Sequence, residues 1–102
     1  MLIVLTSVAT PEDGEGLAEK LVGERLAACV QVLPAARSVY VWDGEIKKET
    51  ETLLLIKTTE DRFGPLERFL RANHPYEVPE IVAVRPEHVS GSYAAWLAGF
   101  LT

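Results

Sequence analysis

The pattern of hydrophobic and polar positions in the first quarter of the chain predicts a strand followed by a helix. Leu2–Val8 is a short, mostly apolar run, which is typical of a strand buried on both faces. Thr10 and Pro11 then form a strong helix start, because threonine caps helices and proline suits the first helical position. Apolar residues recur at helical spacing from there, so the predicted helix runs to about Arg25.

The next segment predicts a long hairpin. Asp43-Gly44 lies between two β-rich stretches, and this pair favours a tight two-residue turn. The incoming strand runs from about Ala28 to Trp42, with Pro34 at a bulge or bend. The outgoing strand runs from about Glu45 to Thr58; its second half is apolar and its first half almost wholly polar.

The length of this hairpin predicts that it leaves the body of the domain. Strands of about 15 residues, at ~3.3 Å each, make a ribbon of roughly 50 Å. A compact domain of this size has a diameter of about 33 Å. The hairpin must therefore overhang the domain or bend sharply at Pro34. An isolated two-stranded ribbon is marginal in water, and Tyr40 and Trp42 lie near its tip. We therefore expect it to pack on a neighbouring subunit.

The remaining residues predict a helix, a strand and a last helix. The second helix is settled from Pro65 onward and ends before Pro75, because a residue that precedes proline avoids helical geometry. Glu80–Val84 is the fourth strand. The last helix carries apolar residues from Tyr93 to Leu101, with Ser92 or Ser90 as its cap.

This β-α-β-β-α-β order with a terminal helix predicts an α+β, ferredoxin-like split βαβ fold in one domain over residues 1–102.

Composition narrows the choice of partners and location. The net charge of −5 argues against nucleic acid or an anionic membrane as main partner. The sequence shows no signal peptide or membrane-spanning run, so we expect a cytoplasmic protein. Thermolabile residue types are scarce, being limited to Asn73, Gln31, Met1 and Cys29, which favours a thermostable protein.

Several common uses of this fold lack their residues. The loop after the first strand has no cysteine pair for soft metals, and acids rather than bases surround Gly14 and Gly16, which disfavours phosphate. The central strands lack the aromatic side chains of RNA-binding members. Cys29 is interpreted as a small buried hydrophobe, and no nucleophile or acid–base pair stands out. We therefore predict that the chain is not an enzyme and needs no organic cofactor.

The most unusual local sequence is the stretch from His74 to Glu80. Its imidazole and the carboxylates of Glu77 and Glu80 lie on a proline-stiffened loop and are candidate ligands for Cu(II) or another divalent cation. The alternative is structural: His74 ends the helix and favours its negative pole.

Several segments, in order across nearly the whole chain, resemble the CutA divalent-cation tolerance proteins. They are Glu24–Val30, Ser38–Ile46, Leu55–Thr58, His74–Ile81 and Tyr93–Trp96.

The resemblance implies a tight homotrimer that assembles through the long hairpin, with an architecture similar to the PII signalling proteins. It also implies copper binding and a role in the response to heavy-metal ions. The family's proposed ligands are a cysteine that closes the first strand and a pair of histidines. Here those positions are Val8 and Asn73-His74, so only His74 carries over.

Two functional hypotheses follow. The first is a trimeric copper-tolerance protein with His74 as ligand and Glu77 and Glu80 as helpers. The second is a PII-like signalling module that binds a small molecule or a protein in clefts between subunits. The candidate cleft residues are Tyr40, Trp42, Lys57, Tyr76 and Trp96.

Overall fold

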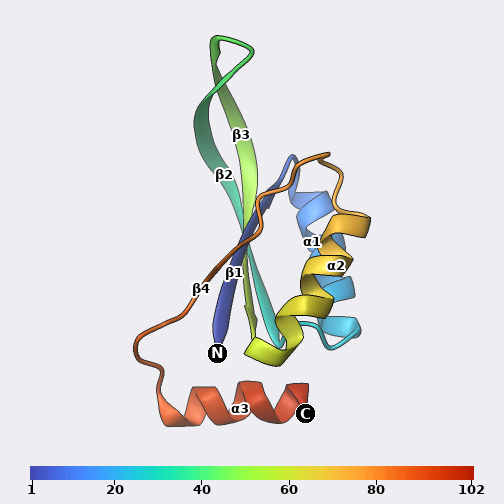
Figure 1. The fold of residues 1–102 in the computed structure, drawn as a ribbon, viewed down its shortest axis with the longest axis vertical. Coiled ribbons are helices and arrows are strands. Elements are labelled where there is room, and N and C mark those ends of the chain that lie inside the picture. Colours follow the sequence, from blue (N-terminus) through green and yellow to red (C-terminus); the bar gives the residue numbers. More distant parts are fainter.

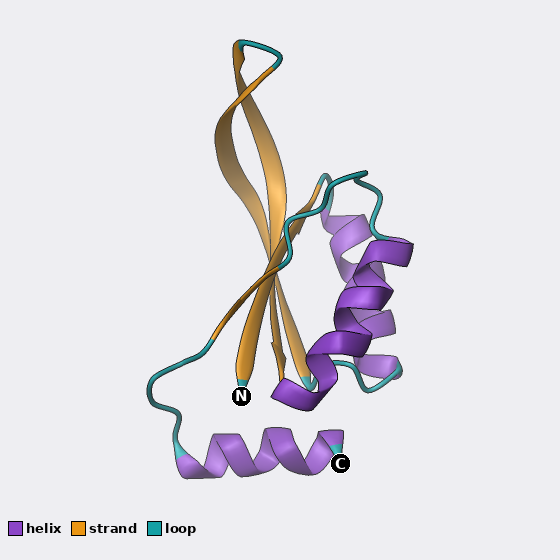
Figure 2. Cartoon of the chain, viewed as in Figure 1, coloured by secondary structure: helices purple, strands orange, loops and turns teal.

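The computed structural model describes residues 1–102 and has the predicted order of elements. The strands pair antiparallel in the order β2-β3-β1-β4, which confirms the ferredoxin-like split βαβ fold. Helices α1 and α2 cover one face of the sheet, and α3 lies across its lower end (Figure 1, Figure 2). The bounds are β1 Leu2–Val8, α1 Pro11–Gly23, β2 Cys29–Trp42, β3 Glu45–Thr58, α2 Phe63–Asn73, β4 Val82–Val84 and α3 Gly91–Leu101.

The hairpin of β2 and β3 overhangs the rest of the chain, as its length predicts (Figure 1). The molecule measures 45 × 27 × 21 Å, with the long axis along the hairpin. Asp43 and Gly44 have φ values of 54° and 78°, which match the two positive φ angles of a type I′ turn. The strand register shifts between Leu33 and Ala36, so Pro34 lies at a bulge. Ala35 within this bulge has a φ of 67°.

The core lies between the sheet and the two helices that cover it. Strand residues on this face are buried, among them Val4 in β1 and Leu54 in β3. They pack against the apolar stripes of α1 and α2, which include Leu21 and Leu70. A smaller cluster, formed by Ala28, Leu97 and Leu101, attaches α3. Only 19 of 102 residues are buried, so much apolar surface stays exposed in the single chain.

The opposite face of the sheet has no helix over it (Figure 2). Its side chains come from alternate strand positions, and Leu33, Val82 and Val84 are all more than 40 % exposed. We call this surface the open face. The overhanging hairpin adds further exposed apolar side chains, which are Val39, Val41, Trp42 and Ile46.

The element ends differ from the sequence predictions at three places. Helix α1 ends at Gly23 rather than Arg25, because Arg25 has a positive φ of 55°. Helix α2 begins at Phe63 rather than Pro65, because a 3-10 turn over Glu60–Arg62 leads directly into it. Pro65 is tolerated as the third helical residue, since the N–H groups of the first helical turn have no hydrogen-bond partner within the helix. Strand β4 covers only Val82–Val84, the part that pairs with β1.

The predicted caps are present. The Thr10 side chain accepts a hydrogen bond from the Asp13 N–H at 3.2 Å, and Ser90, not Ser92, caps α3. The longest helix, α1, has 13 residues, so none of the helices could span a bilayer.

Candidate functional site

A cavity of about 540 Å³ lies where the hairpin leaves the sheet. One wall comes from β2 and β3, where side chains two residues apart point to the same side of the ribbon. The loop between α2 and β4 forms the facing wall, and Ser7 at the end of β1 completes the lining. The ten lining residues are Ser7, Tyr40, Trp42, Lys47, Glu49, Glu51, Tyr76, Glu77, Val78 and Glu80.

His74 holds the loop in place rather than facing outward with a free nitrogen. It ends α2, and its backbone N–H donates to the Leu70 carbonyl at 2.8 Å. Its Nδ1 accepts the Tyr76 N–H at 3.0 Å, which makes Nε2 the protonated nitrogen that donates to the Ser7 carbonyl at 2.9 Å. The side chain is buried, and this burial lowers the pKa of His74; the Ser7 carbonyl and Glu51 act in the opposite direction.

Glu51 is the buried carboxylate of the site, with 9 % of its surface exposed. Its Oε2 accepts hydrogen bonds from the Tyr76 phenol at 2.8 Å and from the Ser7 hydroxyl at 3.4 Å. Burial pushes the pKa of Glu51 upward, but hydrogen bonds from Ser38, Tyr76 and Ser7 outweigh it, and the pKa is lowered. The carboxylate is therefore charged near neutral pH. Burial and this same carboxylate raise the pKa of Tyr76.

A second tyrosine–carboxylate pair lies further along the hairpin. The Tyr40 phenol donates to Glu49 Oε1 at 2.8 Å across the two strands. This hydrogen bond and, to a smaller extent, burial raise the pKa of Tyr40. Lys47 Nζ lies 3.4 Å from Glu45 Oε2, so the one cationic side chain of the lining already has an acidic neighbour.

Within one chain, the residues predicted to lie near clefts between subunits fall into two groups. Tyr40, Trp42 and Tyr76 line the cavity together. Lys57, in β3, and Trp96, on α3, lie apart from it, and both contact Tyr93. The Lys57 Nζ is 5.5 Å from the Tyr93 ring centroid, and the Trp96 ring centroid is 5.7 Å from it.

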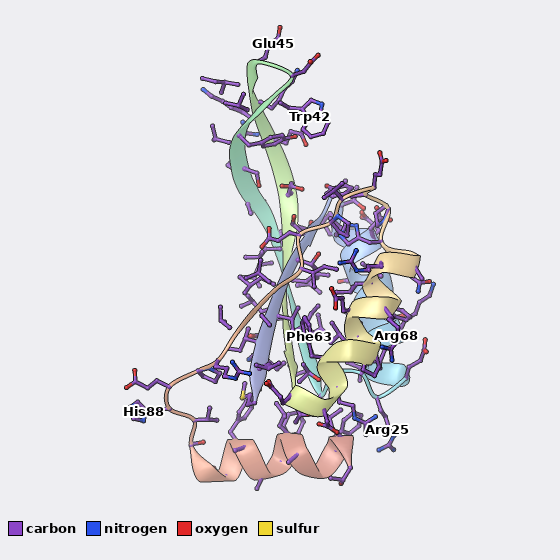
Figure 3. The ribbon with its side chains drawn as sticks, viewed as in Figure 1. Arg25, Trp42, Glu45, Phe63, Arg68 and His88 are labelled. Atoms are coloured by element: carbon purple, nitrogen blue, oxygen red, sulfur yellow. The ribbon has the colours of Figure 1, made fainter.

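The residues predicted as metal ligands do not form a metal centre within one chain. Glu77 and Glu80 are exposed and line the cavity, whereas both nitrogens of His74 are already hydrogen-bonded. No group of three or more His, Cys, Asp and Glu side chains is arranged to hold a metal ion. The other histidine, His88, lies in the loop before α3, at the end of the molecule opposite the hairpin tip (Figure 3). The residues as arranged here do not fit a bound divalent cation.

Sequence reasoning missed Glu51 and Glu49 as members of the site. Both lie in the polar half of β3, where glutamate side chains are expected to be exposed. The sequence contained one signal. Glu51, Leu53 and Leu55 are spaced two residues apart along β3, so their side chains lie on the same face of the sheet, and the two leucines are partly buried. The burial itself depends on Tyr76, which is 25 residues away in the sequence.

The fold and the overhanging hairpin define a class of protein, namely ferredoxin-like α+β subunits whose second and third strands extend beyond the sheet. Comparison of the sequence with known families then identifies it further. The CutA1 divalent ion tolerance protein family matches residues 2–99, and the chain belongs to this family. It is thus a divalent-cation tolerance protein and not an enzyme, as the sequence predicted.

Individual relatives agree with this assignment. The divalent-cation tolerance protein CutA of Thermus thermophilus is 44% identical over 95 residues, covering 93% of this chain and 92% of that protein. The chloroplastic CutA protein of Arabidopsis thaliana is 41% identical over 96 residues, and the chain spans about half, 53%, of its length. The solved structure of CutA from Synechococcus elongatus has a TM-score of 0.96 at 37% identity, covering 99% of this chain and 89% of that one.

Proposed function

We propose that this divalent-cation tolerance protein acts as a homotrimer that binds a small ligand in the cavity at the base of the hairpin. The observation that carries the proposal is the cavity itself. It combines three aromatic side chains, Tyr40, Trp42 and Tyr76, with the buried carboxylate of Glu51. Its volume of about 540 Å³ lies in the ~300–1,000 Å³ range of small-molecule sites. Ligand binding here corresponds to the PII-like hypothesis, with the difference that the lining residues come from one chain rather than from two subunits.

The homotrimer is supported by the surface that one chain leaves uncovered. The open face carries Leu33, Val82 and Val84, and the hairpin adds Val39, Val41 and Ile46. By strand alternation these are two apolar surfaces, because Val39, Val41 and Ile46 project from the side of the ribbon opposite to the open face. Exposed apolar surfaces of this kind mark interfaces. An overhanging ribbon also needs a second surface to pack on, because two strands alone are marginal in water.

Light scattering tests this assembly directly. We expect a particle of three times the 11.3 kDa chain mass. Leu33→Glu places a charge on the open face and should dissociate the particle, whereas Ala72→Glu, at an exposed position on α2, should not. A monomer at micromolar concentration, or equal behaviour of the two variants, contradicts the proposed interface.

Copper binding through His74, with Glu77 and Glu80 as helpers, stays a separate prediction. It requires the loss of a hydrogen bond of the imidazole. A metal bound to either nitrogen replaces one of the two hydrogen bonds of the imidazole. Each is worth about 0.5–1.5 kcal/mol net, which weakens binding by about 2- to 13-fold.

Calorimetric titration with Cu(II) separates these cases. The wild type is compared with His74→Gln and, as matched control, His88→Gln. Micromolar binding that is lost only in the first variant supports a metal site at His74. Micromolar binding that both variants keep moves the copper site elsewhere, and binding weaker than about a millimolar, worth only ~4 kcal/mol, contradicts copper as the ligand.

The cytoplasmic location and the thermostability inferred from composition stay predictions. The Arabidopsis relative is chloroplastic by name. A melting temperature measured by calorimetry tests the second of them.

A further inference from the structure

We propose that the cavity at the base of the hairpin selects a small organic cation, one that carries an ammonium group, over nucleotides, other anions and bare metal ions. This inference rests on the proposed function, since it names the ligand class for the same cavity. Three features of the lining carry it: the balance of charge, the shortage of free hydrogen-bond donors, and the exposed aromatic surface.

The charges of the lining favour a cation. Four carboxylates line the cavity, from Glu49, Glu51, Glu77 and Glu80, against the single ammonium of Lys47. Glu51 is nine-tenths buried and stays charged, because hydrogen bonds from neighbouring hydroxyl groups lower its pKa. A partly enclosed carboxylate is screened less by solvent than a surface one, so its attraction for a cation is stronger.

The hydrogen-bond inventory disfavours an anion. The two phenols of the cavity already donate to its carboxylates, Tyr40 to Glu49 and Tyr76 to Glu51. A phenol has one O–H, so neither can also donate to a ligand while these bonds persist. The Ser7 hydroxyl donates to Glu51 as well. A phosphate would therefore find Lys47 as its one charged donor, beside four carboxylates. An ammonium group, in contrast, brings three donors to oxygens that have lone pairs to spare.

The aromatic surface favours an organic cation over a metal ion. In the single chain, the Trp42 side chain projects from the hairpin close to its turn and is 66 % exposed, and Tyr40 is 39 % exposed (Figure 3). Both lie on the side of the ribbon opposite to the apolar Val39, Val41 and Ile46. Ammonium groups with their carbon chains are attracted to aromatic faces, by about 0.5–2 kcal/mol for each such contact. A metal ion instead needs several ligating side chains converging on one point, and these side chains do not form such a group.

Tryptophan fluorescence provides a local readout because the chain has only two tryptophans. In Trp96→Phe, the sole remaining reporter is Trp42, in the cavity wall. In the matched variant Trp42→Phe, the sole reporter is Trp96, on α3 and away from the cavity. The probe is 1,4-diaminobutane, and its control is 1,4-butanediol, which has the same chain with uncharged hydroxyl ends. ATP and Cu(II) are titrated separately.

We expect 1,4-diaminobutane to change the Trp42 emission saturably and to leave the Trp96 emission unchanged. The affinity should fall at least fivefold in Glu49→Gln, made in the Trp96→Phe background, and stay unchanged in Glu87→Gln, which removes an exposed carboxylate outside the cavity. Both substitutions change the net charge of the chain by the same amount. A difference in diamine affinity between the two variants is therefore due to the loss of a carboxylate from the cavity and not to the change in overall charge.

The inference is overturned if 1,4-butanediol binds as well as the diamine, or if Glu49→Gln binds it as tightly as its parent. It is also overturned if ATP or Cu(II) changes the Trp42 emission and the diamine does not; in that case the cavity still binds a ligand and the proposed function stands. If none of the three ligands changes the Trp42 emission, the cavity is not the binding site and both proposals fail.

Discussion

Stability below neutral pH should depend on His74 and not on His88, the only other histidine. The imidazole of His74 is buried as the neutral tautomer, with Nδ1 accepting a backbone N–H. Protonation would place a second donor against that N–H. Folding therefore lowers the pKa of His74 below its ordinary value of 6.5, and the unfolded chain binds more protons. The resulting stabilisation is complete above about pH 6.5 and is lost as the pH falls through the lower pKa of the folded state.

The size of this loss has an upper bound. If His74 stays neutral throughout in the folded chain, the free energy of unfolding falls by about 1.4 kcal/mol per chain between about pH 8 and about pH 5.5. Guanidinium denaturation at the two pH values, at one fixed protein concentration, measures it. His74→Gln should abolish this part of the fall, and His88→Gln should keep it, because His88 is exposed, with the exposed Glu87 beside it. An equal fall in wild type and His74→Gln refutes the reasoning.

Three further predictions concern stability. Tyr76→Phe removes the 2.8 Å hydrogen bond to Glu51 and should destabilise the protein by about 1.5–3 kcal/mol in urea denaturation at neutral pH. The difference should shrink as the pH falls from 4.5 through the lowered pKa of Glu51, because the folded-state carboxylate then becomes protonated. Gly16→Ala should stabilise α1 by about 0.5–1 kcal/mol in the same assay, because the added methyl group meets no neighbouring atom. Gly14→Ala should instead destabilise the protein, because the added methyl carbon would lie 3.1–3.3 Å from three packed side chains; equal effects of the two substitutions would contradict this packing. Leu97→Ala should lower the free energy of unfolding by about 2–5 kcal/mol and weaken the near-ultraviolet circular dichroism of Trp96, because Leu97 packs α3 against Ala28. A change below about 1 kcal/mol would contradict this packing.

The fold was predictable where local chemistry decides the structure. The Asp43-Gly44 pair fixes the turn and so the register of the hairpin, and Thr10 with Pro11 fixes the start of α1. The ends that differed depend on neighbours in space. Strand β4 is short because β1 pairs with only three of its residues, and no local pattern around Glu80 encodes where that pairing begins.

The candidate site was predictable only in part, because its central contacts join distant segments. Tyr40, Trp42 and Tyr76 were identified as cleft residues, but the carboxylates that bind the two phenols were not. A glutamate in a polar strand is exposed far more often than buried. Its burial here depends on a loop that crosses the end of β1, which is a tertiary arrangement. The same arrangement engages both nitrogens of His74, a fact that residue type and spacing do not reveal.

The ribbon of β2 and β3 also sets an order of events during folding. Its strands pair step by step outward from the Asp43-Gly44 turn, so each further residue pair forms without the entropy cost of closing another loop. Hairpins of this kind form in about 1–10 μs. Strand β1 must then find β3 across roughly 50 residues of chain, which is slower. In the interval the edge of β3 is unpaired over Leu53–Ile56, the most apolar part of the strand. The charged residues that precede it, from Glu45 to Glu51, lie on the same unpaired edge and oppose its pairing with another unfolded chain.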